Sequence, residues 1–254
     1  MNEKQERILE LNRAAQVFFR DSLKGSDAGK ADAALRRLGI KPETAERFGL
    51  GYAPDSETEM LEMLASEGWS KELIEEAGLR WPFGGSGSSA SAVFQNVVTF
   101  PYSDAEGNIL GFAAPFQDDE GPDWFVAPFW PVFDPAGTFF GLDLAVQSGK
   151  NDFILVGDPL DAVLLSQEGF AETIAPYLLS WVKQEQAELL KEYAKRITVI
   201  AGPGASGKKD AKESAENLKK AGLDVRILEL PGQDAVDYIR THGAAAFARL
   251  ATWN

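Results

Sequence analysis

The stretch Asp152–Val163, DFILVGDPLDAV, decides how the second half of the chain is expected to fold. It begins with an apolar run, 153–156, of the kind found in strands that are buried on both faces. The chain then turns through Gly157-Asp158-Pro159, and apolar residues at helical spacing follow. A buried strand that leads into a helix is the repeating unit of an α/β sheet, and such sheets bind ligands at the carboxyl ends of their strands. We therefore expect any functional site at residues 157–161.

The alternation of strand and helix continues to the end of the chain. Strands are predicted over 153–156, 171–175, 197–201 and 224–229, and helices over 159–168, 183–195, 207–221, 234–241 and 243–251. Strands that are separated by helices of this length indicate βαβ units and a mostly parallel sheet flanked by helices. The sequence therefore predicts an α/β domain over residues 150–254.

Residues 1–149 show a different pattern, which indicates an α+β domain of helices and antiparallel strands. Helices are predicted over 5–24, 29–38, 42–48, 57–67 and 70–77, and strands over 93–102 and 109–116. The two strands flank a turn at 104–107, as in a hairpin. Residues 84–92, GGSGSSASA, are predicted to form a long surface loop within this domain.

Composition narrows the classes of function. The net charge of −14 argues against binding to phosphate backbones, because such binding depends on clustered Lys and Arg. The absence of cysteine excludes disulfides and thiol nucleophiles, and the single histidine excludes any mechanism that needs two. Neither a signal peptide nor an apolar run of about 18 residues is present, so we expect a cytoplasmic protein without a membrane segment.

Several short sequence segments, in this order along the chain, resemble the RNA polymerase core of bacterial DnaG-type DNA primases. They cover nearly the whole chain and include LNRAA at 11–15, ERFGLGYAP at 46–54, EAGL at 76–79, FGL at 140–142, QAELL at 186–190 and AGLDV at 221–225. The resemblance implies the primase-core fold, in which residues 150–254 are a Toprim-like domain. The zinc-binding and helicase-binding domains of that family have no counterpart in the sequence.

The resemblance also implies where metal-binding carboxylates should stand. Primer synthesis in the family uses two divalent metals held by carboxylates. The family's Glu-Gly-Tyr-Met-Asp motif matches 157–161, its Asp-Gly-Asp motif matches 202–204, and its Asp-Pro-Asp motif matches 234–236. The carboxylates are replaced at Gly157, Gly202, Gly204 and Val236 and kept at Asp161 and Asp234. We therefore expect no catalytic residue, no metal site and no cofactor.

The basic residues that the family would use on template and nucleotide phosphates are also replaced. Gln95 and Val97 stand at arginine positions, and a Gly-Gly-Arg is replaced by Ala113-Ala114-Pro115. A lysine becomes Asp123, and a later His-Lys becomes Asp134-Pro135. Binding of nucleic acid is therefore expected to be weak or absent.

Three alternatives stay open for the remaining polar and aromatic residues. Residues 202–209, GPGASGKK, have the spacing of a phosphate-binding loop that would use Gly204, Gly207 and Lys208, although Lys209 replaces its Ser or Thr. The acids Asp158, Asp161 and Asp234 could hold one weakly bound Mg²⁺, although Asp158 is equally suited to capping a helix. The aromatic segment 124–140 could pack in the core, stack on bases, or form a protein interface through Trp124, Phe125, Phe129 and Trp130.

The hypothesis favoured by the sequence is a catalytically inactive, DnaG-like Toprim protein. It would act through protein–protein interaction, linked to DNA replication or repair. A nucleotide-binding or weakly active enzyme that uses Gly202–Lys208, and a residual binder of single-stranded nucleic acid, are the alternatives. The partner, its pathway, the oligomeric state, and whether another chain supplies the missing carboxylates do not follow from the sequence.

Overall fold

The computed structural model describes residues 2–81, 91–115, 124–126, 132, 138–177, 181–230 and 233–253. They belong to two compact units: unit 1 comprises Met1–Tyr102 and Asn108–Phe133, and unit 2 comprises Ser103–Gly107 and Asp134–Asn254. The expected boundary at 149/150 lies later in the chain than this change of unit. The difference arises because Phe139, Leu142 and Ala145 are part of the buried core of unit 2.

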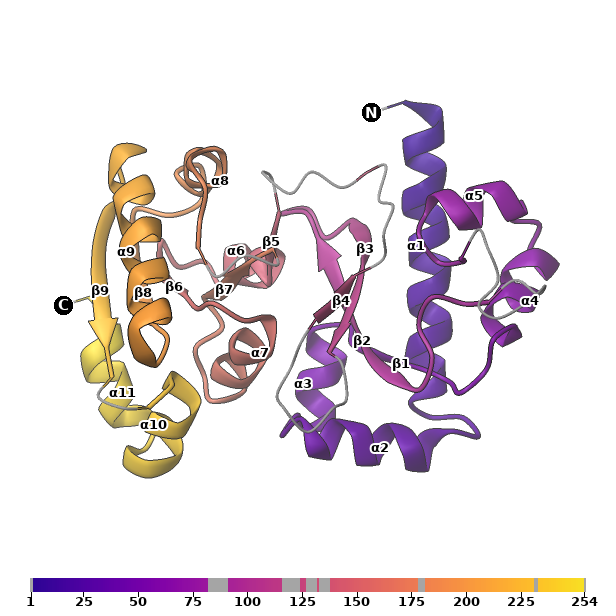
Figure 1. Ribbon diagram of the computed structural model, residues 1–254, viewed down its shortest axis with the longest axis horizontal. Coiled ribbons are helices and arrows are strands. Elements are labelled where there is room, and N and C mark those ends of the chain that lie inside the picture. The colour runs from indigo at the N-terminus through magenta and orange to yellow at the C-terminus, as the bar shows by residue number, and fades with distance from the viewer. Residues whose placement is uncertain are drawn as a thin grey trace. The chain divides into compact units, whose positions relative to one another are not determined.

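Unit 1 contains five helices and a four-stranded sheet within its described residues. The helices are α1 (Glu3–Ser22), α2 (Ala28–Arg37), α3 (Pro42–Arg47), α4 (Glu59–Ser66) and α5 (Lys71–Glu76). The strands are β1 (Gly51–Ala53), β2 (Val97–Ser103), β3 (Ile109–Pro115) and β4 (Trp124–Val126), and they lie in the order β1-β2-β3-β4 (Figure 1). β1 pairs with β2, and β3 with β4, in antiparallel register. The expected α+β pattern of this half is confirmed.

Helix α1 is the central element of unit 1. Asn2 caps its first turn, and the side chain of Gln5 returns the hydrogen bond to the backbone of Asn2. Its apolar face, with Leu11 and Phe19 fully buried, packs on the sheet. Gly51 of β1 lies so close to α1 that an added Cβ would be 2.4 Å from the Cβ of Phe19. Only glycine fits there, which explains why Gly51 stands in the segment 46–54.

Unit 2 contains a five-stranded sheet in the order β5-β7-β6-β8-β9. The strands are β5 (Phe139–Phe140), β6 (Asp152–Leu155), β7 (Thr173–Pro176), β8 (Arg196–Ala201) and β9 (Asp224–Glu229). The helices are α6 (Leu142–Gln147), α7 (Pro159–Gln167), α8 (Gln184–Leu190), α9 (Gly204–Lys220), α10 (Ala235–His242) and α11 (Ala244–Ala251). The pairs β6–β7, β6–β8 and β8–β9 are parallel, and among the described strands of this sheet only β5 pairs in antiparallel register. The predicted mostly parallel sheet is confirmed.

Both faces of the unit 2 sheet are covered, which explains the continuous apolar runs in its central strands. Phe153 and Leu155 of β6 face a core that includes residues of α6, α8 and α9. Helix α7 packs against β7 and α10. The ring of Phe247 in α11 lies 4.9 Å from the ring of Phe170. Figure 1 shows α9 lying along β8 and β9. This wrapping fixes the strand ends from which the candidate site is built.

Some element limits differ from those expected. Strand β2 begins at Val97 and not at 93, because Asn96 has a left-handed backbone (φ 53°) that interrupts the extended chain. Helix α8 ends at Leu190 and not at 195, whereas α9 begins at Gly204 and not at 207. The predicted loop at 84–92 lies outside the described residues except for Ser91 and Ala92. Within the described part of the chain, no helix has both the length and the apolar character needed to span a membrane.

Candidate functional site

A cavity of about 310 Å³ opens at the carboxyl ends of β6 and β8 in unit 2. Apolar residues of the two strands line its base, including Leu155 and Val199. Most of the rest of the lining comes from one face of α9 and from residues at or just before the starts of α7 and α10, among them Gly157, Asp158 and Asp234. The cavity therefore coincides with the place where the resemblance implies a metal site, and each lining side chain can be tested for that role.

Gly157 leaves open space at the end of β6. It is exposed, and a Cβ placed on it would meet no atom within 4 Å. The backbone at Gly157 does not have the left-handed conformation that requires glycine. A glutamate could therefore be accommodated at this position, but the side chain that could reach a metal is absent.

The second glycine-containing segment follows β8. Gly202 lines the cavity, and Gly204 begins α9 with a left-handed φ of 80°. A Cβ on Gly207 would lie 2.5 Å from the carbonyl carbon of Gly202. The glycine at 207 therefore allows the first turn of α9 to pack directly on the end of β8. This close backbone contact accounts for the glycines at 202 and 207 without any bound ligand.

Asp158 and Asp234, two of the three acids considered for a weakly bound Mg²⁺, serve as helix caps. Oδ1 of Asp158 accepts a hydrogen bond from the backbone N–H of Leu160 at 2.7 Å, at the start of α7. Oδ1 of Asp234 accepts one from the backbone N–H of Asp237 at 2.7 Å, at the start of α10. Such caps satisfy helix N–H groups that have no partner within the helix. The capping interpretation of Asp158 is confirmed.

Asp161 is the third of these acids, and its environment disfavours its charged form. Burial, and to a lesser extent the nearby Asp158, Asp234 and Asp237, together raise the pKa of Asp161 from 3.8 to about 7. Among the described residues, the side chain of Asp161 forms no hydrogen bond and no ion pair. At neutral pH a large fraction of this carboxyl group is therefore protonated.

The donor set does not fit the pair of divalent metals that the resemblance implies. Gly157, Gly202 and Gly204 offer no side-chain oxygen, and Val236 replaces the second acid of its motif. Asp158 and Asp234 already use one oxygen each on backbone N–H groups. Across the described ranges, no group of three or more His, Asp or Glu side chains is arranged to hold a metal ion.

Lys208 lies outside the cavity lining and forms an ion pair elsewhere. Its Nζ is 2.7 Å from Oε2 of Glu229 in β9, and both side chains are more than half exposed. Because α9 begins at Gly204, the residues from 204 to 208 form helix and not the open loop that would wrap a phosphate. The proposed use of Gly204, Gly207 and Lys208 for phosphate remains untested.

The positions at which the resemblance implies template-binding arginines lie in unit 1. Nε2 of Gln95 donates to Oγ of Ser91 at 2.8 Å and to the carbonyl oxygen of Ala92 at 3.0 Å. Ala113 and Ala114 are buried within β3. These residues therefore pack within unit 1 and present no positive charge.

The aromatic residues proposed as an interface are described only in part. Trp124 is half-buried, and its ring lies edge-on to Phe100 at 4.8 Å. Phe125 belongs to β4, whereas Phe129 and Trp130 lie outside the described residues. Trp124 thus packs on a fully buried core residue, and the interface prediction for the other aromatic residues remains untested.

Three residues of the cavity escaped the sequence analysis. Ser206, Asp210 and Ser214 of α9 all line it. Their spacing of four residues places them on one helical face, which is the signal that could have identified them. Oγ of Ser214 is occupied, because it accepts the backbone N–H of Val182 at 2.9 Å.

Comparison with known proteins identifies the family. The protein-family model of the N-terminal domain of the DNA primase catalytic core matches residues 18–146, about half of the chain. The DNA primase of Clostridium acetobutylicum is 31% identical over 251 residues, which cover 98% of this chain and 41% of the relative. The DNA primase of Aquifex aeolicus is 30% identical over 237 residues, which cover 92% of this chain and 46% of the relative. The chain thus spans less than half the length of these curated relatives.

A solved structure gives the same result for the fold. The zinc-binding and RNA polymerase domains of Aquifex aeolicus primase superpose with a TM-score of 0.87 at 27% sequence identity. The match covers 98% of this chain and 61% of that structure. The predicted mixed α/β primase-core architecture is therefore confirmed.

Proposed function

Because this chain belongs to the DnaG-type bacterial DNA primase catalytic core family, we propose that it is a member that does not synthesise primers. It acts in DNA replication or repair by binding a protein partner. The cavity at the carboxyl ends of β6 and β8 carries this proposal, because glycines stand where the resemblance implies metal-binding carboxylates.

The remaining acids strengthen the argument because each has a different role or charge state. Asp158 and Asp234 cap helices, and the raised pKa of Asp161 reduces its negative charge at neutral pH. Two-metal catalysis depends on carboxylates that hold both ions against the reacting phosphate. Without them the fold can still present its surfaces to another protein.

The first experiment measures Mn²⁺ binding by calorimetry and does not depend on any other domain. We expect no heat of binding above that of nonspecific surface carboxylates for the natural chain. The matched variant Gly157→Glu/Gly202→Asp places two carboxylates in the cavity, and Gly157 has open space for its new side chain. Saturable binding by the variant alone supports the proposal, whereas tight binding by the natural chain that Asp161→Ala abolishes contradicts it.

The second experiment is a primer-synthesis assay on single-stranded DNA with ribonucleotides and either Mg²⁺ or Mn²⁺. We expect no template-dependent oligoribonucleotide from this chain, with an active DnaG-type core as the positive control. Products that disappear in Asp161→Ala would show that the chain is a polymerase. Salt-sensitive binding of labelled single-stranded DNA would instead favour the residual nucleic-acid binder.

A further inference from the structure

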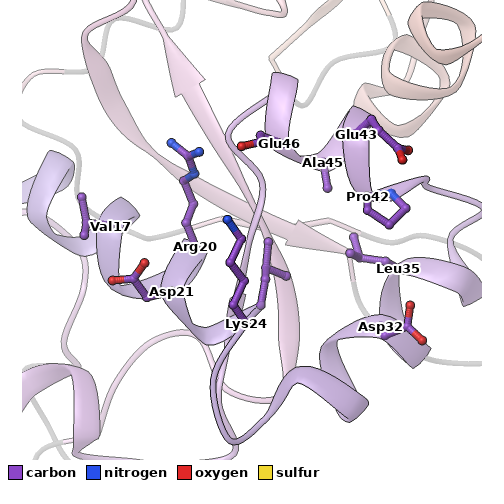
Figure 2. Close-up of a pocket in the computed structure, with 11 residues that line it drawn as sticks. Val17, Arg20, Asp21, Lys24, Asp32, Leu35, Pro42, Glu43, Ala45 and Glu46 are labelled. Atoms are coloured by element: carbon purple, nitrogen blue, oxygen red, sulfur yellow. The ribbon is translucent and has the colours of Figure 1, made fainter.

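A groove of about 380 Å³ lies in unit 1, whereas the candidate site belongs to unit 2. One wall is formed by the end of α1 and the turn after it, and the other by α2 and α3 (Figure 2). Buried apolar side chains form part of its lining, including Leu35 and Ala45. Val17, at the edge of the groove, is 53% exposed, the most exposed of the large apolar side chains in the described part of the chain.

The exposed wall is a second face of α1. Its buried face carries Leu11, Ala15 and Phe19, whereas Val17 and Arg20 lie one helical step apart on the groove side. Neither the sheet nor another helix covers this apolar side chain, so a partner that buries it lowers the free energy of the complex.

Charges of opposite sign line the two walls. Arg20 and Lys24 stand on the α1 side beside Asp21, and Glu43 and Glu46 stand on the α3 side with Asp32 of α2, so the first wall is net positive and the second is acidic. Figure 2 shows Arg20 on α1 and Lys24 on the turn after it, with Pro42 and Glu43 on the opposite wall. Among the described residues, Arg20, Lys24, Glu43 and Glu46 form no ion pair within 4.0 Å, whereas Asp32 pairs with Arg36. Both walls therefore hold charges that are available to another molecule.

We propose that this groove, defined by Val17, Arg20, Lys24, Glu43 and Glu46, binds an amphipathic segment of a protein partner. Apolar side chains of the segment cover Val17 and the base of the groove. Its acidic side chains pair with Arg20 and Lys24, and basic side chains on its opposite edge face Glu43 and Glu46. The inference rests on the proposed function, because it identifies the surface and the partner chemistry that the function requires.

Charge complementarity selects this occupant over simpler ones. A uniformly acidic segment is repelled by Glu43 and Glu46 and by the net charge of −14. A uniformly basic segment is attracted by the acids of the lining but leaves Arg20 and Lys24, beside Val17, without partners. Apolar contacts at the centre of an interface with charged pairs at its edge are the usual arrangement in protein recognition.

The test begins with a photo-crosslinking amino acid at position 17 of the full chain. The same amino acid at position 250 is the matched control, because Leu250 is 40% exposed in unit 2. After exposure to a lysate of the native host, the crosslinked segment is sequenced by mass spectrometry and synthesised as a peptide. Capture alone supports nothing; the segment must contain apolar, acidic and basic residues in the predicted arrangement.

The affinity of that peptide is then measured for two charge-reversed variants. Arg20→Glu/Lys24→Glu should weaken binding by about tenfold or more. Lys219→Glu/Lys220→Glu, at exposed positions of α9, changes the net charge equally and should leave the affinity within about twofold. Circular dichroism verifies that both variants are folded.

Four results would overturn the inference. They are an equal loss of affinity in the two variants, a crosslinked segment without acidic residues, a crosslink to a second copy of this chain, and no crosslinking at position 17 above that at 250. A partner that crosslinks only at position 250 would show that the groove is not the binding surface, although the chain would still bind a protein. Primer synthesis by the chain would instead contradict the proposed function. Failure of the groove proposal and failure of the proposed function are therefore distinguishable.

Discussion

The two ends of the β6–β8 strand pair differ in how their charged residues are used. At the amino end, Nε of Arg196 donates to Oδ1 of Asp152 at 2.7 Å, and Nζ of Lys150 lies 2.7 Å from Oε1 of Glu172. At the carboxyl end, the strands continue into Gly157 and Gly202. Charged side chains pair between neighbouring strands at the amino end, whereas at the carboxyl end glycines stand at positions where the family resemblance implies metal-binding carboxylates. The comparison separates residues that maintain the fold from residues that perform chemistry.

The largest expected effect concerns Asp161 at the carboxyl end. Its folded-state pKa of about 7 exceeds the ordinary 3.8, so the folded state binds the proton more tightly than the unfolded state. This contribution to stability is fully present below about pH 4 and is lost as the pH rises through about 7. Asp161→Asn should therefore raise the free energy of unfolding by about 2–4 kcal/mol at pH 8 and by much less at pH 4.

Urea denaturation at both pH values measures the Asp161 effect. Asp224→Asn, at the exposed start of β9, is the control and should change stability little at either pH. A stability gain in Asp161→Asn that is the same at pH 4 and pH 8 would show that the carboxyl group is not held protonated.

An intermediate effect is expected at the amino end, where Thr198 connects three elements. Its Oγ1 donates to the carbonyl oxygen of Ala251 at 2.9 Å and accepts from Nε of Arg226 at 3.0 Å. Thr198→Val keeps the shape but leaves both partners unpaired, so the free energy of unfolding should fall by about 1–3 kcal/mol.

Thr241→Val is the matched control for Thr198. Its hydroxyl donates to the carbonyl oxygen of Asp237 at an exposed site, so its loss should change stability by about 0.5 kcal/mol or less. Thermal or urea unfolding compares the two valines directly. Similar losses in both would mean that the buried bonds at the amino end do not hold the sheet together.

The smallest effect is expected for Lys208, at the start of α9. Its ion pair with Glu229 is exposed, so Lys208→Ala should change the free energy of unfolding by less than about 0.5 kcal/mol. Calorimetry with ATP should give no binding heat for either the natural chain or the variant. Lys209→Ala, whose Nζ is 3.7 Å from Glu213, is the control. ATP binding that is lost only in Lys208→Ala would restore the phosphate-loop interpretation.

Much of the fold followed from the sequence because local patterns agree with it. The apolar runs of β6 and β8 and the helices after them indicated the parallel sheet correctly. The sequence analysis missed β5 and α6, because β5 has two residues and both elements follow an aromatic segment without clear periodicity. A strand this short is defined by its partner β7 and not by its own pattern.

The candidate site was predictable in position but not in detail. The place where Gly157 and Gly202 come together follows from the topology of a parallel sheet. That Lys208 pairs with Glu229, and that Asp210 faces the cavity, depends on the start and rotation of α9. The pKa of Asp161 depends on burial and on acids 70 or more positions along the chain, at Asp234 and Asp237. Such contacts leave no signal in a local pattern.

The left-handed backbone of Gly204 also bears on the cost of building a metal site. An aspartate at this position would have to adopt a conformation that costs about 1 kcal/mol for a residue with a side chain. Asp234 would have to release the first turn of α10 before it could turn toward a metal. Either change therefore lowers stability before it adds any metal binding, so the cost of a metal site here is set by the backbone as well as by the side chains.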